Sequence, residues 1–190
     1  MAVAARRIGV AMDFSPSSKN ALKWAMENVI RKGDQLILVT VRHEGHCEKA
    51  EMQPREASAS GSPFIPLMEL SDPATMKKYG VKHDPEIVDI VSAGAKQKEV
   101  MCFFTKFNSF RFFTDLSLCM NYDSQVEILM KVYWGDPREK LCEAIGGISL
   151  SCIIVGNRGL GKLKRAIMGS VSNYVVNNGS CAVTVVKHHV

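Results

Sequence analysis

The chain has 190 residues, of which 46% are hydrophobic and 23% are charged. These fractions are close to the averages of folded proteins and exclude a mostly disordered chain, and the length suits a single domain over residues 1–190. The net charge of +5 is small and the Lys and Arg residues are scattered, so we expect no nucleic-acid partner and no membrane-surface role.

The compartment is predicted from apolar runs and cysteines. No window reaches the ~18 apolar residues of a membrane span. Arg6 and Arg7 lead into a short strand-like run instead of a signal-peptide core. The six cysteines form no CxxC pair and no spacing typical of a disulfide framework. We therefore expect a cytoplasmic protein with reduced, mostly buried thiols.

Apolar periodicity predicts five strands that alternate with four helices. The strands are expected at residues 8–12, 35–41, 128–133, 152–155 and 182–186, and the helices at 16–32, 84–99, from 137 onward and at about 166–177. Residues 43–80, rich in proline and small residues, are expected to form a long loop outside regular structure. Because right-handed crossovers are nearly obligatory, this alternation predicts a parallel α/β sheet with helices on both faces.

Residues 100–125 do not fit this pattern, because they hold six of the eight phenylalanines without a helical or strand period. Phe, Leu, Ser and Cys have T-rich codons, Val100 can begin with GT and Gln125 can end in AG. We interpret the segment as an irregular insertion that derives from a retained intron read in frame, whose removal would join Glu99 to Val126. The alternative is a genuine insertion whose apolar face contacts a partner.

The segment from Gly156 to Ser172 has the spacing of a phosphate-binding turn followed by a helix. A P-loop would need Ser or Thr where Leu163 stands, and a dinucleotide fingerprint would need glycine where Lys164 stands. The remaining glycines let backbone amides approach an anion, and Ser170 and Ser172 add hydroxyls at a helix start. A tight turn at Gly156 and a serine cap at Ser170 are the alternative without a ligand.

The glycine pattern, VAMDFSPSS after the first strand, VYWGDPREKL and the closing CAVTVVK together resemble the universal stress protein family, in particular its plant single-domain members with the ATP-binding pattern. The resemblance runs from about Arg7 to Lys187, apart from residues 100–125. It implies a five-stranded parallel sheet of order 3-2-1-4-5 with the Rossmann-like, adenine nucleotide alpha hydrolase-like fold. It also implies binding of ATP or AMP and a homodimer formed through the last strand.

The resemblance also assigns roles by position. Met12, Asp13 and Val41 would meet adenine and ribose, and Asp13 would hold Mg²⁺ if the metal takes part. The phosphates would contact Gly156, Asn157, Arg158, Gly159, Gly169, Ser170, Val171 and Ser172. In a sheet of this order the chain reverses between strands one and four, which brings Asp13 and Gly156 to one crevice. Asp13 can also be interpreted as the cap of the first helix.

These positions supply glycines, serines and cations but no obvious base to activate water, so we predict a stress-response protein that binds ATP as a binding or switch module. Slow ATP hydrolysis with Asp13 and Mg²⁺ is one alternative. A dimeric, chaperone-like interaction protein with a vestigial nucleotide site is another. Arg158 is the first candidate for a cation at the phosphates, with further charge from Lys162, Lys164 and Arg165. His43, His46 and Cys47 are too few for a metal site.

Overall fold

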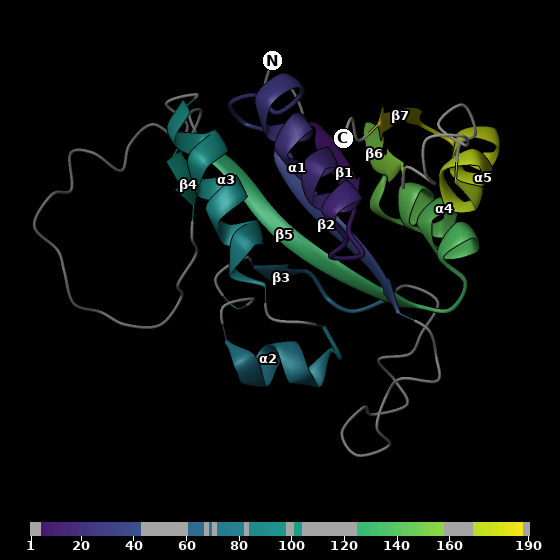
Figure 1. The fold of residues 1–190 in the computed structure, drawn as a ribbon, viewed down its shortest axis with the longest axis horizontal. Helices are drawn as coiled ribbons and strands as arrows, with labels where there is room; N and C mark the ends of the chain where they lie inside the picture. Colours follow the sequence, from purple (N-terminus) through teal and green to yellow (C-terminus); the bar gives the residue numbers. More distant parts are fainter. Residues whose placement is uncertain are drawn as a thin grey trace, which may run out of the picture.

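The computed structural model describes residues 5–42, 61–66, 69, 72–81, 84–97, 101–103, 125–157 and 169–187. Its elements are seven strands and five helices (Figure 1). In chain order they are β1 (Arg7–Ala11), α1 (Pro16–Asn28), β2 (Gln35–Arg42), β3 (Ile65–Pro66), α2 (Pro73–Lys78), α3 (Pro85–Gln97), β4 (Met101–Phe103), β5 (Gln125–Trp134), α4 (Pro137–Ile148), β6 (Cys152–Asn157), α5 (Ser170–Asn178) and β7 (Ala182–Lys187).

The strands form one sheet in the order β3-β5-β2-β1-β6-β7, and β4 also pairs with β5. The five strands β5-β2-β1-β6-β7 are parallel, and numbered among themselves they have the predicted order 3-2-1-4-5. The predicted count of five is wrong, because β3 and β4 add two short strands beside β5. β3 runs antiparallel to β5, with Ile65 opposite Met130, and β4 runs parallel to it, with Met101 opposite Gln125.

The short elements lie where irregular structure was expected. β3 and α2 lie within residues 43–80, and β4 and the first residue of β5 lie within residues 100–125. Asp72 caps α2 by accepting hydrogen bonds from the amides of Ala74 and Thr75, at 3.3 and 3.0 Å. Pro73 then takes the first helical position, which proline suits. The prediction of one long loop over residues 43–80 is therefore wrong.

Two predicted helix boundaries also move. α1 ends at Asn28 instead of near Lys32, because a turn follows in which Asp34 accepts a hydrogen bond from the Arg31 amide at 2.8 Å. α5 begins at Ser170, and residues 166–168 of the predicted helix lie outside the described residues. Gly33 in the turn has a φ of 81°, which explains the glycine there.

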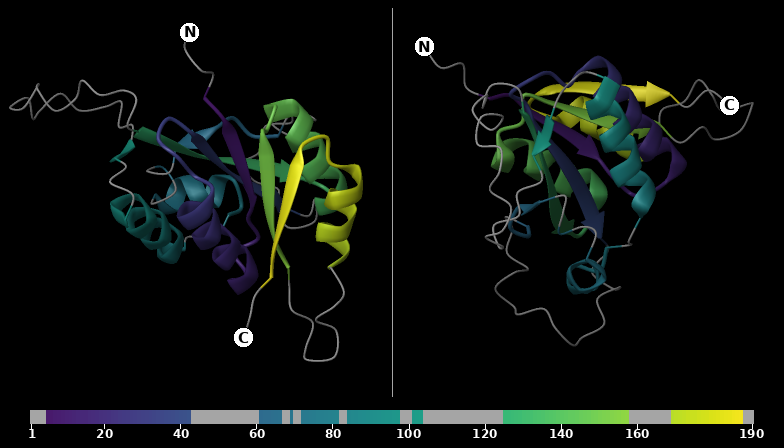
Figure 2. Two further views of the ribbon diagram at one scale, coloured as in Figure 1. Left: turned by 90° about the horizontal axis from the view of Figure 1, so that it is seen from above. Right: turned by 90° about the vertical axis from the view of Figure 1, so that its left-hand side faces the viewer.

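Both faces of the sheet are covered, as the uninterrupted apolar run of β2 predicts. Leu36 and Leu38 belong to a buried cluster with residues of α1 and α3. Ile37 and Val39 belong to a second cluster with residues of α4 and α5. Figure 2 (left) shows the two helix pairs on opposite sides of the strands. Within the described ranges, no helix is long and apolar enough to cross a membrane.

Candidate functional site

The chain reverses its direction of travel through the sheet between β1 and β6. β1 pairs with β2 on one side and with β6 on the other. From β1 the chain proceeds outward to β2 and β5, and then crosses back to β6. Ligands of open α/β sheets bind at such a reversal, beyond the carboxyl ends of the strands. Asp13 lies just after β1 and Gly156 lies near the end of β6, so both stand at this edge.

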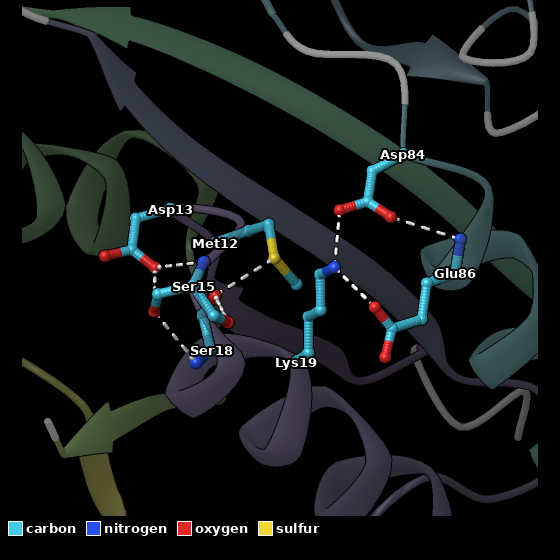
Figure 3. A network of polar contacts seen from close by, with 7 residues as sticks. All are labelled: Met12, Asp13, Ser15, Ser18, Lys19, Asp84 and Glu86. Atoms are coloured by element: carbon cyan, nitrogen blue, oxygen red, sulfur yellow. Dashed lines mark hydrogen bonds and ion pairs between the residues drawn. The ribbon is translucent and has the colours of Figure 1, made fainter. Parts of the chain in front are cut away.

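The turn after β1 is held by Asp13 (Figure 3). One carboxylate oxygen, Oδ1, accepts hydrogen bonds from the Ser15 amide at 3.0 Å and from the Ser15 hydroxyl at 2.5 Å. Ser15, in turn, is the N-cap of α1 and accepts a hydrogen bond from the Ser18 amide at 3.3 Å. The interpretation of Asp13 as the helix cap is therefore wrong, because Ser15 takes that place and Asp13 orients it. Asp13 itself is exposed.

Phe14, between these two residues, has a φ of 63°. A bulky side chain in the left-handed region costs roughly 1–3 kcal/mol, and such residues gather at functional sites. The hydrogen bonds between Asp13, Ser15 and Ser18 hold the turn in this conformation.

Met12 contributes to the core beneath this turn. Its side chain is buried with those of α1 and α3, and its sulfur accepts a hydrogen bond from the Ser18 hydroxyl at 3.4 Å. Its amide donates to the carbonyl of Val39 at 2.9 Å. The side chain of Met12 thus packs in the core beneath the candidate site.

The backbone groups of Val41 point toward the place where the chain reverses its direction through the sheet. The last register pair between β1 and β2 is Ala11 with Val39, whose carbonyl bonds to the Met12 amide. Every second residue of a strand points its N–H and C=O to the same side, so those of Val41 point toward β1 but beyond its end. The Val41 side chain packs half-buried toward α4 and α5. Its backbone is therefore the part that faces the crevice.

Gly156 is required by packing, and its φ is not positive. A Cβ atom at this position would lie 2.6 Å from the carbonyl carbon of Ser17 and 3.0 Å from the amide nitrogen of Ser18. The alternative of a tight turn at Gly156 is therefore wrong, because the residue lies within β6. It lets the first turn of α1 press against β6, which fixes the helix start at the edge of the site.

Asn157 connects β6 to the start of α5. Its side chain is only 4% exposed, and its Oδ1 accepts a hydrogen bond from the Gly169 amide at 3.0 Å. Gly169 is the N-cap of α5 and has no side chain to offer, so the predicted serine cap at Ser170 is wrong. Ser170 is instead the first helical residue, and it is exposed.

The first turn of α5 presents backbone amides more than hydroxyls. Ser172 is 2% exposed and donates its hydroxyl proton to the Gly169 carbonyl at 3.0 Å, while Val171 packs partly against the α4 and α5 cluster. Since the N-cap supplies no side-chain acceptor, the amides of residues 170–172 have no capping side chain among the residues that the structure describes. Such a helix start attracts an anion.

Several predicted site residues lie outside the described residues. They are Arg158 and Gly159, the cations Lys162, Lys164 and Arg165, and the trio His43, His46 and Cys47. Among the residues that are described, no group of three His, Cys, Asp or Glu side chains is arranged to hold a metal ion.

A partly exposed group of ion pairs joins α1 to the start of α3 beside the turn (Figure 3). The ammonium of Lys19 lies 2.6 Å from a carboxylate oxygen of Asp84 and 2.5 Å from one of Glu86. Hydrogen bonding to Asp84, and then to Glu86, raises the pKa of Lys19. These contacts join the start of α3 to the first turn of α1.

Sequence reasoning missed two polar atoms near this edge. The hydroxyl oxygen of Thr40 and the indole nitrogen of Trp134 are buried and have no hydrogen-bond partner in the structure as described. Each such atom costs roughly 1–3 kcal/mol. The only signal in the sequence is a threonine within the apolar run LILVT and a tryptophan that ends a strand.

The family model that matches the chain is that of the universal stress protein family, over residues 4–93 and 115–187. The chain belongs to the universal stress protein family. It is 30% identical to universal stress protein PHOS34 of Arabidopsis thaliana over 97% of this chain and 63% of the relative. It is 29% identical to universal stress protein PHOS32 of the same plant, over 97% of this chain and 66% of the relative. This universal stress protein thus spans slightly less than two thirds of the length of these relatives.

Solved structures agree on the universal stress protein fold. A universal stress protein crystallised in complex with cAMP is 17% identical, with a TM-score of 0.52, over 97% of this chain and 98% of that one. The hypothetical protein MJ0577 is 20% identical, with a TM-score of 0.51, over 98% of this chain and 99% of that one.

Proposed function

We propose that this universal stress protein binds an adenine nucleotide, ATP in particular, and acts in a stress response as a binding or switch module without fast hydrolysis. The observation that carries the proposal is the first turn of α5. Gly169 leaves the helix amides without a capping side chain, and Asn157 holds this turn against the end of β6. Phosphate oxygens would accept hydrogen bonds from these amides and be favoured by the helix dipole.

The base and ribose would lie on the β2 side of the reversal. The backbone groups of Val41 point beyond the end of β1, and the exposed carboxylate of Asp13 lies between that strand end and α5. Asp13 would accept hydrogen bonds from the ribose hydroxyls through its carboxylate. The relative solved in complex with cAMP supports an adenine nucleotide as the ligand class.

Further proposals concern metal, assembly and compartment. Mg²⁺ is bound in nucleotide sites by one or two carboxylates together with the phosphates, which Asp13 could supply. A homodimer would form through β7, whose only strand neighbour among the described residues is β6. We place the protein in the cytoplasm, where thiols such as those of Cys142, Cys152 and Cys181 stay reduced.

The test is a charge placed at the first turn of α5. Ser170→Asp puts a carboxylate at an exposed helix start, where it interacts favourably with the dipole but repels a phosphate. We expect ATP affinity, measured by calorimetry, to fall at least tenfold while the free energy of unfolding stays the same or rises. Ser180→Asp is the matched control, because it adds the same charge beyond the other end of α5, and it should leave affinity unchanged.

The two alternatives separate in the same assays. If the wild-type protein binds no ATP, AMP or cAMP, the nucleotide site is vestigial and the interaction-protein alternative holds. If metal-loaded protein hydrolyses ATP in a single turnover and Asp13→Ala removes that rate, the protein is a slow hydrolase instead of a switch.

A further inference from the structure

We propose that Thr40 and Trp134 recognise the base of the bound nucleotide by side-chain hydrogen bonds, an inference that rests on the proposed function. Their polar atoms are the buried ones without a partner in the described part of the chain. Thr40 is 1% exposed and Trp134 is 9% exposed. Buried hydroxyl and indole groups almost always find a partner, so an unpaired couple near a candidate site calls for a ligand.

The strand register brings the two side chains to one face. Thr40 is opposite Val132, and Trp134 is opposite Arg42. Side chains alternate along a strand, so Thr40 lies on the same side of β2 as Leu36 and Leu38, and Trp134 belongs to the same buried cluster. Trp134 lies two residues beyond Val132, which is the partner of Thr40 on the neighbouring strand. The Cα atoms of Thr40 and Trp134 are therefore roughly 8 Å apart. The two side chains thus lie near each other on one face of the sheet.

The pair also lies at the correct end of the sheet. Trp134 is the last residue of β5, and Thr40 immediately precedes Val41, whose backbone faces the crevice. The sheet order places β2 and β5 on one side of β1, and β6 with α5 on the other. Four adjacent strands, β6 to β5, span roughly 14 Å. A nucleotide with its phosphates at α5 can extend along this edge with its base at Thr40 and Trp134.

The donor and acceptor types of the two atoms complement those on the edge of the base. The indole nitrogen of Trp134 is a donor only, whereas the Thr40 hydroxyl both donates and accepts. Adenine presents unprotonated ring nitrogens as acceptors and an exocyclic amino group as a donor. Trp134 would therefore donate to a ring nitrogen, and Thr40 would accept from the amino group.

Thr40→Val and Trp134→Phe test the inference, because each removes the polar atom and keeps most of the shape. Without ligand, both variants should be as stable as the wild-type protein or more stable, since a buried atom without a partner is removed. With ATP, calorimetry should show a loss of affinity of about tenfold for each variant. Trp24→Phe is the control, because Trp24 is the other tryptophan and lies on α1, and it should leave affinity unchanged.

Adenine nucleotide analogues that lack one ring nitrogen identify the contact. The analogues are 1-deaza-ATP, 3-deaza-ATP and 7-deaza-ATP, and Trp134→Phe should cause no further loss of affinity for the one that lacks the nitrogen contacted by the indole. A further tenfold loss with all three analogues would overturn the assignment.

Other results also overturn the inference. If both variants bind ATP as the wild-type protein does, Thr40 and Trp134 do not contact the base, although the proposed function stands. If both variants lose stability without ligand and keep their affinity, the two atoms serve a structural water. If the wild-type protein binds no nucleotide, the proposed function fails first and the inference fails with it.

Discussion

Gly156 shows how a residue chosen for packing can resemble one chosen for a ligand. The Cβ atom of an alanine would lie 2.6 Å from the Ser17 carbonyl carbon, so α1 would have to move away from β6. We expect Gly156→Ala to lower the free energy of unfolding by about 2 kcal/mol. Gly146→Ala is the control, because Gly146 lies inside α4 with open space around it, and it should raise that energy by up to about 1 kcal/mol. Urea unfolding of both variants measures the difference; equal stabilities would contradict the packing argument.

Tyr133 gives the protein a pH dependence at high pH. Burial, with a smaller effect of Glu143, raises the pKa of Tyr133 to about 12 from the ordinary 10.0. Because the folded state binds this proton more tightly than the unfolded state, the contribution is complete below pH 10 and is lost between pH 10 and about 12. The loss should amount to roughly 2 kcal/mol. Tyr133→Phe should flatten this part of the stability profile, and an unchanged slope would argue against burial as the cause.

Residue roles were predictable from the sequence only in part. The spacing of Gly156 and Gly169 predicted that both lie near a strand end and a helix start, but the reason for each glycine depends on neighbours far along the chain. Ser172 illustrates the limit, because its hydroxyl proton is given to the Gly169 carbonyl. Thr40 and Trp134 could not be found at all, since a buried atom without a partner is defined by what surrounds it in three dimensions.

At the scale of elements, long periodic segments were predictable and short ones were not. β2 and α4 follow clear apolar patterns, and Asp136 caps α4 as its sequence indicates, with a bond of 2.8 Å from the Arg138 amide. Asp72 and Pro73 begin α2 in the same way, but no apolar period follows them. β3 and β4 are strands only because β5 offers them a partner. A strand of two or three residues carries too little pattern to be predicted by itself.

The segment of residues 100–125 enters and leaves the sheet at neighbouring points. Met101 and Gln125 are register partners on adjacent strands, so their Cα atoms lie about 5 Å apart. The family model leaves out residues 94–114. A chain from which residues 100–125 are removed would join Glu99 to Val126, two residues beyond the end of α3, which is an ordinary connection from a helix to a strand.

We therefore expect the variant lacking residues 100–125 to fold with an unchanged or larger free energy of unfolding and to bind nucleotide as the full chain does. The described candidate site residues lie between Met12 and Val41 and from Trp134 onward, so none is removed. Urea unfolding and calorimetry on both chains provide the measurement. Sequencing of mature transcripts tests the intron hypothesis separately. An insoluble or unfolded variant would show that the segment is part of the fold.

For the whole molecule, the doubly wound architecture followed from the sequence because both sides of the sheet need apolar cover. Alternate residues of β2 pack into two separate buried clusters, one with residues of α1 and α3 and one with residues of α4 and α5. A run such as LILVT is typical of a strand that is covered on both faces of a parallel sheet. The extra strands at the outer edge could not be inferred, because they satisfy backbone groups and do not change the apolar pattern.

The two rims of the sheet differ in a way that limits growth. Along β5, the outer rim is occupied by β4 at Gln125–Glu127, by β3 at Leu129 and Met130, and by Ser62, which bonds to the amide and the carbonyl of Val132. β7 ends the strand order at the other rim. Among the described residues, the outer rim of β5 is thus covered by two short strands, whereas β7 presents a six-residue strand with β6 on one side only. Short edge strands limit edge-to-edge association, so a second copy that paired with this sheet would be expected to do so along β7 and not along β5.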